Sequence, residues 1–173
     1  MSEPLAYFLS WHTYGTWLHG DERGSIDPRH NVYGEPFAAA SDDRARSEHD
    51  RLKDPVVRLD APDRIIVQRT LLEVAEHRGW RPLAMHVRTT HVHVVISAGA
   101  KIERVLNDFK SYATRRLREA GRFAADADVW SRHGSTRYLW NEAQVRSKVD
   151  YVVNAQGPPI APPPFVAEEH RKA

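Results

Sequence analysis

Residues 90–96 restrict the fold of this chain more than any other segment. They read Thr-His-Val-His-Val-Val-Ile, a short apolar run that contains two histidines. Side chains alternate across a strand, so His91 and His93 share one face while the neighbouring valines share the other. Burial of two adjacent imidazoles without partners is costly, and a divalent metal can bind one nitrogen from each. The run therefore predicts a strand that carries either half of a metal site or two half-exposed histidines.

Three other segments are also predicted to be strands. Residues 83–88 form an apolar run that is joined to the histidine strand by Thr89 and Thr90, and this short connection predicts an antiparallel hairpin. Residues 6–12 and 135–140 are rich in aromatic side chains, which are enriched in strands. The chain therefore supplies four predicted strands.

Three segments have the periodicity of helices. Residues 61–77 follow Asp60, a residue type suited to cap a helix N-terminus. Residues 102–119 carry a continuous apolar stripe at helical spacing. A last helix is expected to begin after the cap residue Asn141 and to end near Gly157.

The order of these elements predicts an α+β fold. It is strand, long excursion, helix, strand, strand, helix, strand, helix, which is the split pattern of a ferredoxin-like antiparallel sheet with helices on one face and a C-terminal helix. We expect one domain over residues 1–157, with a long polar insertion at 21–60. Residues 158–173 are proline-rich and then charged, and are expected to form a tail.

Composition excludes several classes of chemistry. The chain has 173 residues and no cysteine, which excludes disulfides, thiolate zinc sites and a cysteine nucleophile and fits a cytoplasmic protein. No apolar run approaches the roughly 20 residues of a membrane span, so no membrane partner is expected. The net charge of +2 and the pI of 9.0 are compatible with a nucleic-acid partner but too weak to argue for one.

Basic residues are concentrated in the second predicted helix and beyond it. Within this segment Lys110 and Arg115 are candidate phosphate contacts, and the alternative is a solvated helix face. The positions that make up the basic segment are Lys101, Arg104, Lys110, Arg115, Arg116, Arg118 and Arg122.

Tyr151 on the last predicted helix is a candidate nucleophile. On a helical wheel it shares a side with Gln144 and Lys148, while valines occupy the other side. Lys148 lies one turn earlier, where a cation would favour a phenolate or bind a phosphate. The alternative is an amphipathic tyrosine at the rim of the core.

Other aromatic side chains leave several alternatives open. Tyr112 is a rival nucleophile, but it lies at the edge of an apolar stripe and packing is its expected role. Trp11, Tyr14 and Trp17 could stack unpaired bases or cover the core. We expect Trp11 in the core and keep Trp17 as a candidate DNA contact. Three histidines have no partner visible in the sequence and are expected to be ordinary polar positions: His12, His86 and His133.

Four motifs occur in an order that resembles a known family. They are residues 7–17, 90–95, 107–112 and 149–154, and together they span most of the chain. They resemble the single-tyrosine HUH transposases, in particular the REP-associated tyrosine transposases. The family hallmark, His-hydrophobic-His on a central strand, is matched by His91-Val92-His93, and its catalytic tyrosine on a late helix is matched by Tyr151.

The resemblance implies a metal-dependent endonuclease and strand transferase that cuts single-stranded DNA next to hairpins. Tyr151 would attack a phosphodiester to give a 5′-phosphotyrosine and a free 3′-hydroxyl, with Mg²⁺ or Mn²⁺ at His91 and His93. The implied partner is single-stranded DNA with a REP-like hairpin, contacted by Lys110, Arg115, Lys148 and Trp17. The implied setting is the cytoplasm in association with the nucleoid, as a monomer or homodimer.

The third metal ligand departs from the family pattern. The family places Gln or Asn one turn after the tyrosine, where this chain has Ala155, with Asn154 and Gln156 on either side. Asn154 lies about 60° from Tyr151 around a helix and Gln156 about 140°. We expect Asn154 to be the ligand, or Gln156 if the helix unwinds before the glycine that follows it.

Two alternative functions remain at this stage. A ferredoxin-like sheet can also act as a non-catalytic module that binds single-stranded RNA or DNA, although such modules carry Phe or Tyr where this chain has His91 and His93. A domesticated transposase would retain cleavage without moving its own gene.

Overall fold

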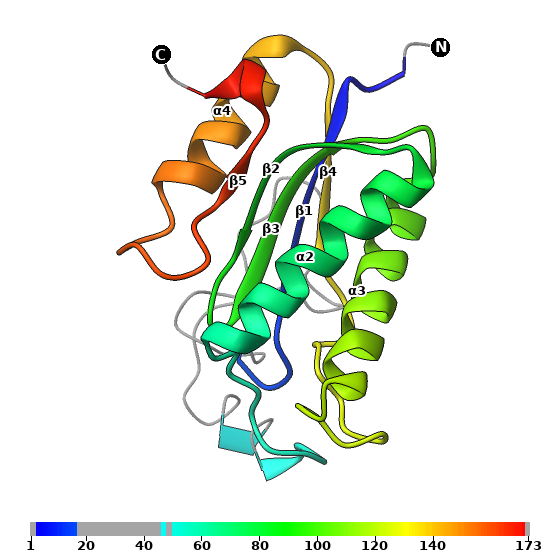
Figure 1. The fold of residues 1–173 in the computed structure, drawn as a ribbon, viewed down its shortest axis with the longest axis vertical. Coiled ribbons are helices and arrows are strands. Elements are labelled where there is room, and N and C mark those ends of the chain that lie inside the picture. The colour runs from blue at the N-terminus through cyan, green and yellow to red at the C-terminus, as the bar shows by residue number, and fades with distance from the viewer. Residues whose placement is uncertain (1–2, 17–45, 48–49, 172–173) are drawn as a thin grey trace.

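A computed structural model describes residues 3–16, 46–47 and 50–171 (Figure 1). Within them one antiparallel sheet has the strand order β4-β1-β3-β2-β5. Its strands are β1 Ala6–His12, β2 Arg81–Val87, β3 His91–Ser97, β4 Ser135–Leu139 and β5 Phe165–Val166. The helices are α2 Ala61–Arg78, α3 Ile102–Glu119 and α4 Glu142–Asn154, with a 3₁₀ turn at Glu168–His170. This arrangement confirms the predicted α+β ferredoxin-like class.

Local sequence signals set the ends of α2. The Asp60 carboxylate accepts a hydrogen bond from the Asp63 backbone at 2.9 Å, and the Asp63 carboxylate accepts one from the Asp60 backbone at 3.1 Å. This reciprocal pair satisfies two backbone donors that a helix start leaves open. Gly79 ends the helix in the left-handed region, with φ 68°, where glycine carries no steric penalty.

The sheet separates two layers of helices. Helices α2 and α3 cover one face, and α4 lies against the other (Figure 1). The strand alternation predicted for β3 is confirmed, since its valine face and its histidine face lie on opposite sides. Val92, Val94 and Ile96 belong to the core beneath α2 and α3. Val95 belongs to a smaller core beneath α4, together with Phe8, Val145, Val149 and Val152.

The segment after residue 157 is part of the sheet, which corrects the expectation of a tail. Strand β5 pairs with β2, and Phe165 lies opposite Met85. Arginine side chains also bind carbonyls of this segment: Arg88 donates to Pro158 at 2.8 Å and Arg64 donates to Ala161 at 2.8 Å. The prolines remove amide donors, but their carbonyl oxygens still accept hydrogen bonds.

Most of the predicted insertion lies outside the described residues. Its last part is in the core, because Val57 and Leu59 are buried and their amides bond to Tyr14 and Thr89 carbonyls at 2.9 and 2.8 Å. In the part of the chain that the structure describes, no helix has the length and apolar character to cross a membrane.

Candidate active site

Four histidines gather on the face of the sheet that α4 covers. His91 and His93 lie on β3 with their ring centroids 4.8 Å apart. In the sheet register His93 lies opposite His86 of β2, and His91 lies opposite His12 of β1. The rings of His12 and His91 are 5.6 Å apart. The histidine pair recognised in the sequence is therefore part of a larger cluster.

This cluster corrects the expectation that His12 and His86 are ordinary polar positions. One signal for His86 was available in the sequence, because a two-residue connection between strands fixes the pairing of a hairpin and places residue 86 opposite residue 93. The pairing of β1 with β3 joins segments far apart in the chain, so no local signal could place His12. His133, by contrast, is exposed outside the cluster.

Burial keeps the imidazole of His93 neutral. His93 is 7% exposed, and burial lowers its pKa to about 3. Nearby histidines lower this pKa further, while a hydrogen bond with Gln156 opposes the shift. Its Nδ1 atom is buried and has no hydrogen-bond partner among the described residues. A neutral imidazole with an unused nitrogen is suited to bind a metal ion.

His86 joins the histidine strand to the tyrosine helix. It is 4% exposed, and burial lowers its pKa. Its Nδ1–H donates to the carbonyl of Val152 at 3.2 Å, and this carbonyl belongs to the residue that follows Tyr151. A carbonyl can only accept, so the proton is on Nδ1 and the Nε2 lone pair is open. His86 thus helps to hold α4 in place.

Tyr151 lies beside the histidines. Its ring centroid is 5.5 Å from that of His93 and 6.1 Å from that of Phe8, in edge-on contacts. The side chain is 39% exposed, and its hydroxyl makes no hydrogen bond with the residues that the structure describes. The ring of the tyrosine therefore packs on its neighbours while the residue as a whole remains exposed.

Lys148 supplies positive charge next to this tyrosine. Its Nζ atom lies 5.2 Å from the centre of the Tyr151 ring and 5.0 Å from that of Phe8. Partial burial lowers the pKa of Lys148, and the positive charge of Arg137 lowers it further. The predicted neighbours Lys148 and Tyr151 are thus brought together with the histidine pair.

Gln156 and not Asn154 is brought to the histidines. The Gln156 Oε1 atom accepts from His91 Nε2 at 3.3 Å, and its Nε2–H donates to the Tyr151 carbonyl at 3.1 Å. Asn154 is exposed and donates to Asp150 at 2.7 Å. The helix ends at Asn154, and Ala155 departs from helical geometry with φ −111° and ψ 21°. This early end of α4 meets the condition under which Gln156 was the expected ligand.

The donor set fits a divalent ion. Two imidazoles and one amide oxygen converge from β3 and from the end of α4. Among the described residues, no three His, Cys, Asp or Glu side chains form a group that could hold a metal. The amide of Gln156 would therefore have to complete the set beside His91 and His93. Three protein donors leave coordination positions for water or a phosphate oxygen.

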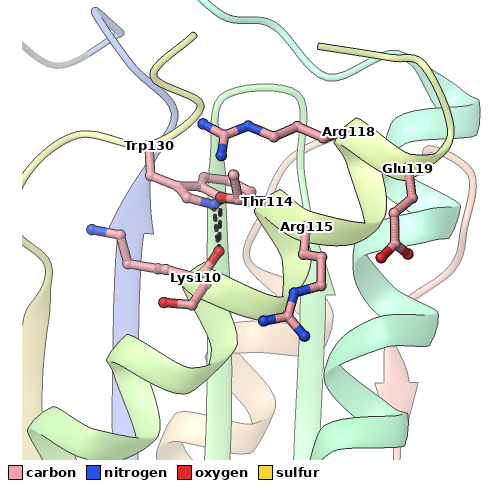
Figure 2. A pocket seen from close by; sticks show the side chains of 7 residues that line it. Lys110, Thr114, Arg115, Arg118, Glu119 and Trp130 are labelled. Carbon is pink, nitrogen blue, oxygen red and sulfur yellow. Dashed lines mark hydrogen bonds between the residues drawn. The ribbon is translucent and has the colours of Figure 1, made fainter. Parts of the chain in front are cut away.

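The other predicted phosphate contacts lie on the opposite side of the sheet. Lys110 and Arg115 are on α3 and line an open pocket of about 510 Å³ with Arg118 and Trp130 (Figure 2). Lys110 Nζ donates to the carbonyl of Ser131 at 2.7 Å, and burial lowers its pKa. The structure therefore does not bring Lys110 and Arg115 to Tyr151. Lys110 holds the chain that leads into β4.

The aromatic candidates Trp11, Tyr112 and Tyr14 pack in or against the core beneath α2 and α3. Trp11 is fully buried, as expected. Tyr112 packs against the core beneath α2 and α3, so the sheet separates it from the histidine pair. Tyr14 also packs there, and its hydroxyl accepts from the Lys53 amide at 2.8 Å. Trp17 lies outside the described residues.

Comparisons with known proteins identify similar folds. No family model and no curated protein sequence matches the chain. The structure of a REP-associated tyrosine transposase bound to a REP hairpin is similar, with a TM-score of 0.50 and 12% identity. The similarity covers 87% of this chain and 66% of that transposase. A "putative transposase" from Deinococcus radiodurans R1 aligns with a TM-score of 0.44 and 15% identity, over 90% of this chain and 93% of that one.

The structural comparison confirms the resemblance recognised in the sequence at the level of the fold. The chain has the fold of a REP-associated tyrosine transposase and spans about two thirds of that protein's length.

Proposed function

We propose that this protein is a transposase-like, metal-dependent endonuclease and strand transferase that cuts single-stranded DNA next to hairpins. The observation that carries the proposal is the position of Tyr151, an exposed residue whose ring lies 5.5 Å from that of His93. Gln156 at His91 and Lys148 over the tyrosine ring complete the group. The fold shared with a transposase bound to a REP hairpin supports DNA as the substrate.

In the proposed reaction the Tyr151 oxygen loses its proton and attacks the phosphorus of a phosphodiester. A bond forms between the tyrosine oxygen and phosphorus, and the bond from phosphorus to the 3′-oxygen of the preceding nucleotide breaks. That oxygen leaves with a proton as a free 3′-hydroxyl, and the 5′-phosphate stays on the protein. A phenol is a weak nucleophile at neutral pH, so the adjacent charge of Lys148 serves to stabilise the developing phenolate.

The same covalent link makes strand transfer possible. The phosphotyrosine ester retains the bond that a 3′-hydroxyl needs in order to reverse the step, so a second strand can replace the tyrosine without an external energy source. One residue can then both cut and rejoin.

His91, His93 and Gln156 would hold the metal ion in this proposal. Mg²⁺ or Mn²⁺ bound there would polarise the phosphate and offset its negative charge. Burial contributes by keeping His93 neutral, since a protonated imidazole has no lone pair to donate. His86 acts on the site indirectly, through its hydrogen bond to the helix that carries Tyr151.

Substitution of the tyrosine tests the proposal. Tyr151→Phe removes the hydroxyl but keeps the packed ring, so we expect the covalent adduct with a labelled hairpin oligonucleotide to fall at least about 1,000-fold with hairpin binding retained. Denaturing gels measure the adduct and fluorescence anisotropy measures binding. Tyr112→Phe is the matched control and should leave adduct formation unchanged.

Two results would contradict the assignment. One is an adduct that survives Tyr151→Phe and disappears in Tyr112→Phe. The other is undiminished cleavage by the unaltered protein in excess EDTA, because the proposed site requires a divalent ion.

A further inference from the structure

Two large aromatic side chains at the edge of the sheet are exposed. Tyr138 is 45% exposed and Trp140 is 50% exposed. Their rings stack on each other, with centroids 5.8 Å apart and planes inclined by 26°. Adjacent exposed aromatic rings are typical of surfaces that bind a ligand.

Buried groups of the sheet pack beneath this pair. Tyr7 of β1 lies opposite Tyr138 in the sheet register, and the two rings meet edge-on with centroids 5.5 Å apart. Tyr7 is 9% exposed, and its hydroxyl donates to the Ala100 carbonyl at 3.0 Å. Tyr138 and Trp140 therefore present a preformed flat surface.

The aromatic pair lies at the edge of the sheet on the α2/α3 face, since Tyr138 lies opposite Tyr7 and Tyr7 lies opposite Ile96. Strand β4 is the terminal strand on its side of the sheet. Arg137, the residue before Tyr138, faces the opposite way and pairs with Phe8. The Phe8 ring contacts both Lys148 and Tyr151, so β1, the neighbour of the edge strand, links Arg137 to the tyrosine site. A chain that rounds this edge passes from the aromatic pair to Tyr151.

The charges along this path suit a phosphate backbone. Arg137 and Lys148 form no ion pair with any residue that the structure describes. Stacked aromatic rings next to unneutralised cations are the features that bind single-stranded nucleic acid, since every base has a face that can stack. An apolar peptide would not use these charges, and the bases of a duplex are already stacked on each other.

We propose that Tyr138 and Trp140 form a stacking platform for unpaired bases of the DNA strand that is cut at Tyr151, with Arg137 and Lys148 contacting the intervening phosphates. The proposal rests on the proposed function and adds to it the surface that guides the single-stranded flank of the hairpin.

The test measures binding of a short single-stranded oligonucleotide by fluorescence anisotropy in EDTA, so that cleavage does not interfere. Trp140→Ala should weaken binding about 5- to 150-fold, the range for loss of one stacked base, without changing the salt dependence. Trp140→Phe keeps an aromatic ring and should retain most of the affinity. Ile65→Ala removes another exposed apolar side chain, 41% exposed on α2, and should have no effect.

The neighbouring cation gives a second, independent readout. Arg137→Gln should reduce the slope of log affinity against log salt by about 0.7, the value for one phosphate contact on a single strand. The contributions of stacking and of charge to DNA affinity are thus measured separately with the same oligonucleotide. A parallel thermal melt reports whether each variant is folded. If Trp140→Ala does not fold, the DNA affinities of Trp140→Phe and of the unaltered protein are compared instead.

The outcomes distinguish this proposal from the proposed function. Unchanged DNA affinity in folded Trp140→Ala overturns the platform, while adduct formation still tests Tyr151 separately. No single-stranded binding by the unaltered protein overturns both. If Trp140→Ala instead converts a dimer to a monomer in sedimentation velocity with DNA affinity unchanged, the surface binds a second copy of the chain and the platform is wrong.

Discussion

The two faces of the sheet differ in what covers them. The face beneath α2 and α3 is packed with large apolar side chains that are fully buried, including Trp11, Phe109 and Leu117. The face beneath α4 is packed mainly by the smaller side chains Val149 and Val152 and their neighbours. Since buried apolar area drives folding, most of the stability of this domain is expected on the first face.

The face beneath α4 also carries polar side chains. It carries four imidazoles side by side, of which His86 and His93 are buried, and these groups contribute little hydrophobic free energy. It also leaves Tyr151 exposed at the rim, where a ligand can reach it. The larger apolar core and the candidate active site therefore lie on opposite sides of one sheet.

Substitutions in the two cores test this difference in stability most directly. Phe109→Ala removes a fully buried ring and should lower the free energy of unfolding by about 3–5 kcal/mol. Val149→Ala, on the α4 face, removes two methyl groups and should lower the free energy of unfolding by about 2 kcal/mol. Urea denaturation measures both values. An equal or larger cost for Val149→Ala would show that stability is not concentrated beneath α2 and α3.

Substitutions at the end of α4 test which amide side chain binds the metal ion on the second face. Gln156→Ala should weaken Mn²⁺ affinity by roughly 10- to 100-fold, a size typical of changes around a metal site. Asn154→Ala should have little effect, because this side chain bonds to Asp150. Mn²⁺ titrations of binding and of adduct formation measure the two variants. The reverse order would mean that α4 continues further in the metal-bound protein, and two silent variants would mean that no amide binds the ion.

The buried imidazoles predict a smaller effect of pH on stability. The pKa of His93 is lowered from 6.5 to about 3 by burial, so the unfolded chain binds a proton below pH 6.5 that the folded protein does not bind. The stability that this group contributes is complete above pH 6.5 and is lost as the pH falls. The slope for one such group approaches about 1.4 kcal/mol per pH unit.

Denaturation in EDTA between pH 7.5 and pH 5 measures this slope, in a range where carboxylates stay ionised. His93→Gln should flatten it, because the amide does not titrate. Stability that stays constant over this range in the unaltered protein would contradict the burial of a neutral His93.

Local patterns predicted the elements because their causes are local. The cap at Asp60 and the left-handed end at Gly79 lie within one or two turns of the residues they affect. The alternation of His91 and His93 with valines follows from the pleat of a single strand. The family resemblance then supplied the role of Tyr151, and the structure places this tyrosine on the histidine face.

Features that depend on distant pairing could not be predicted in this way. The positions of His12 beside His91 and of Tyr138 beside Tyr7 follow from the register of strands far apart in the sequence. The edge strand at Phe165 was missed because a proline-rich segment has no periodicity of its own and forms a strand only against β2.

The sequence alone predicted the order of strands and helices as far as α4 and the alternation of side chains within each strand, because backbone geometry sets these over a few residues. Only the tertiary structure decided which faces meet. It placed Gln156 and not Asn154 at the histidines, because α4 ends where Ala155 leaves helical geometry and the chain turns through Gly157, with φ 84°. It also separated Lys110 and Arg115 from Tyr151, because α3 and α4 pack on opposite faces of the sheet.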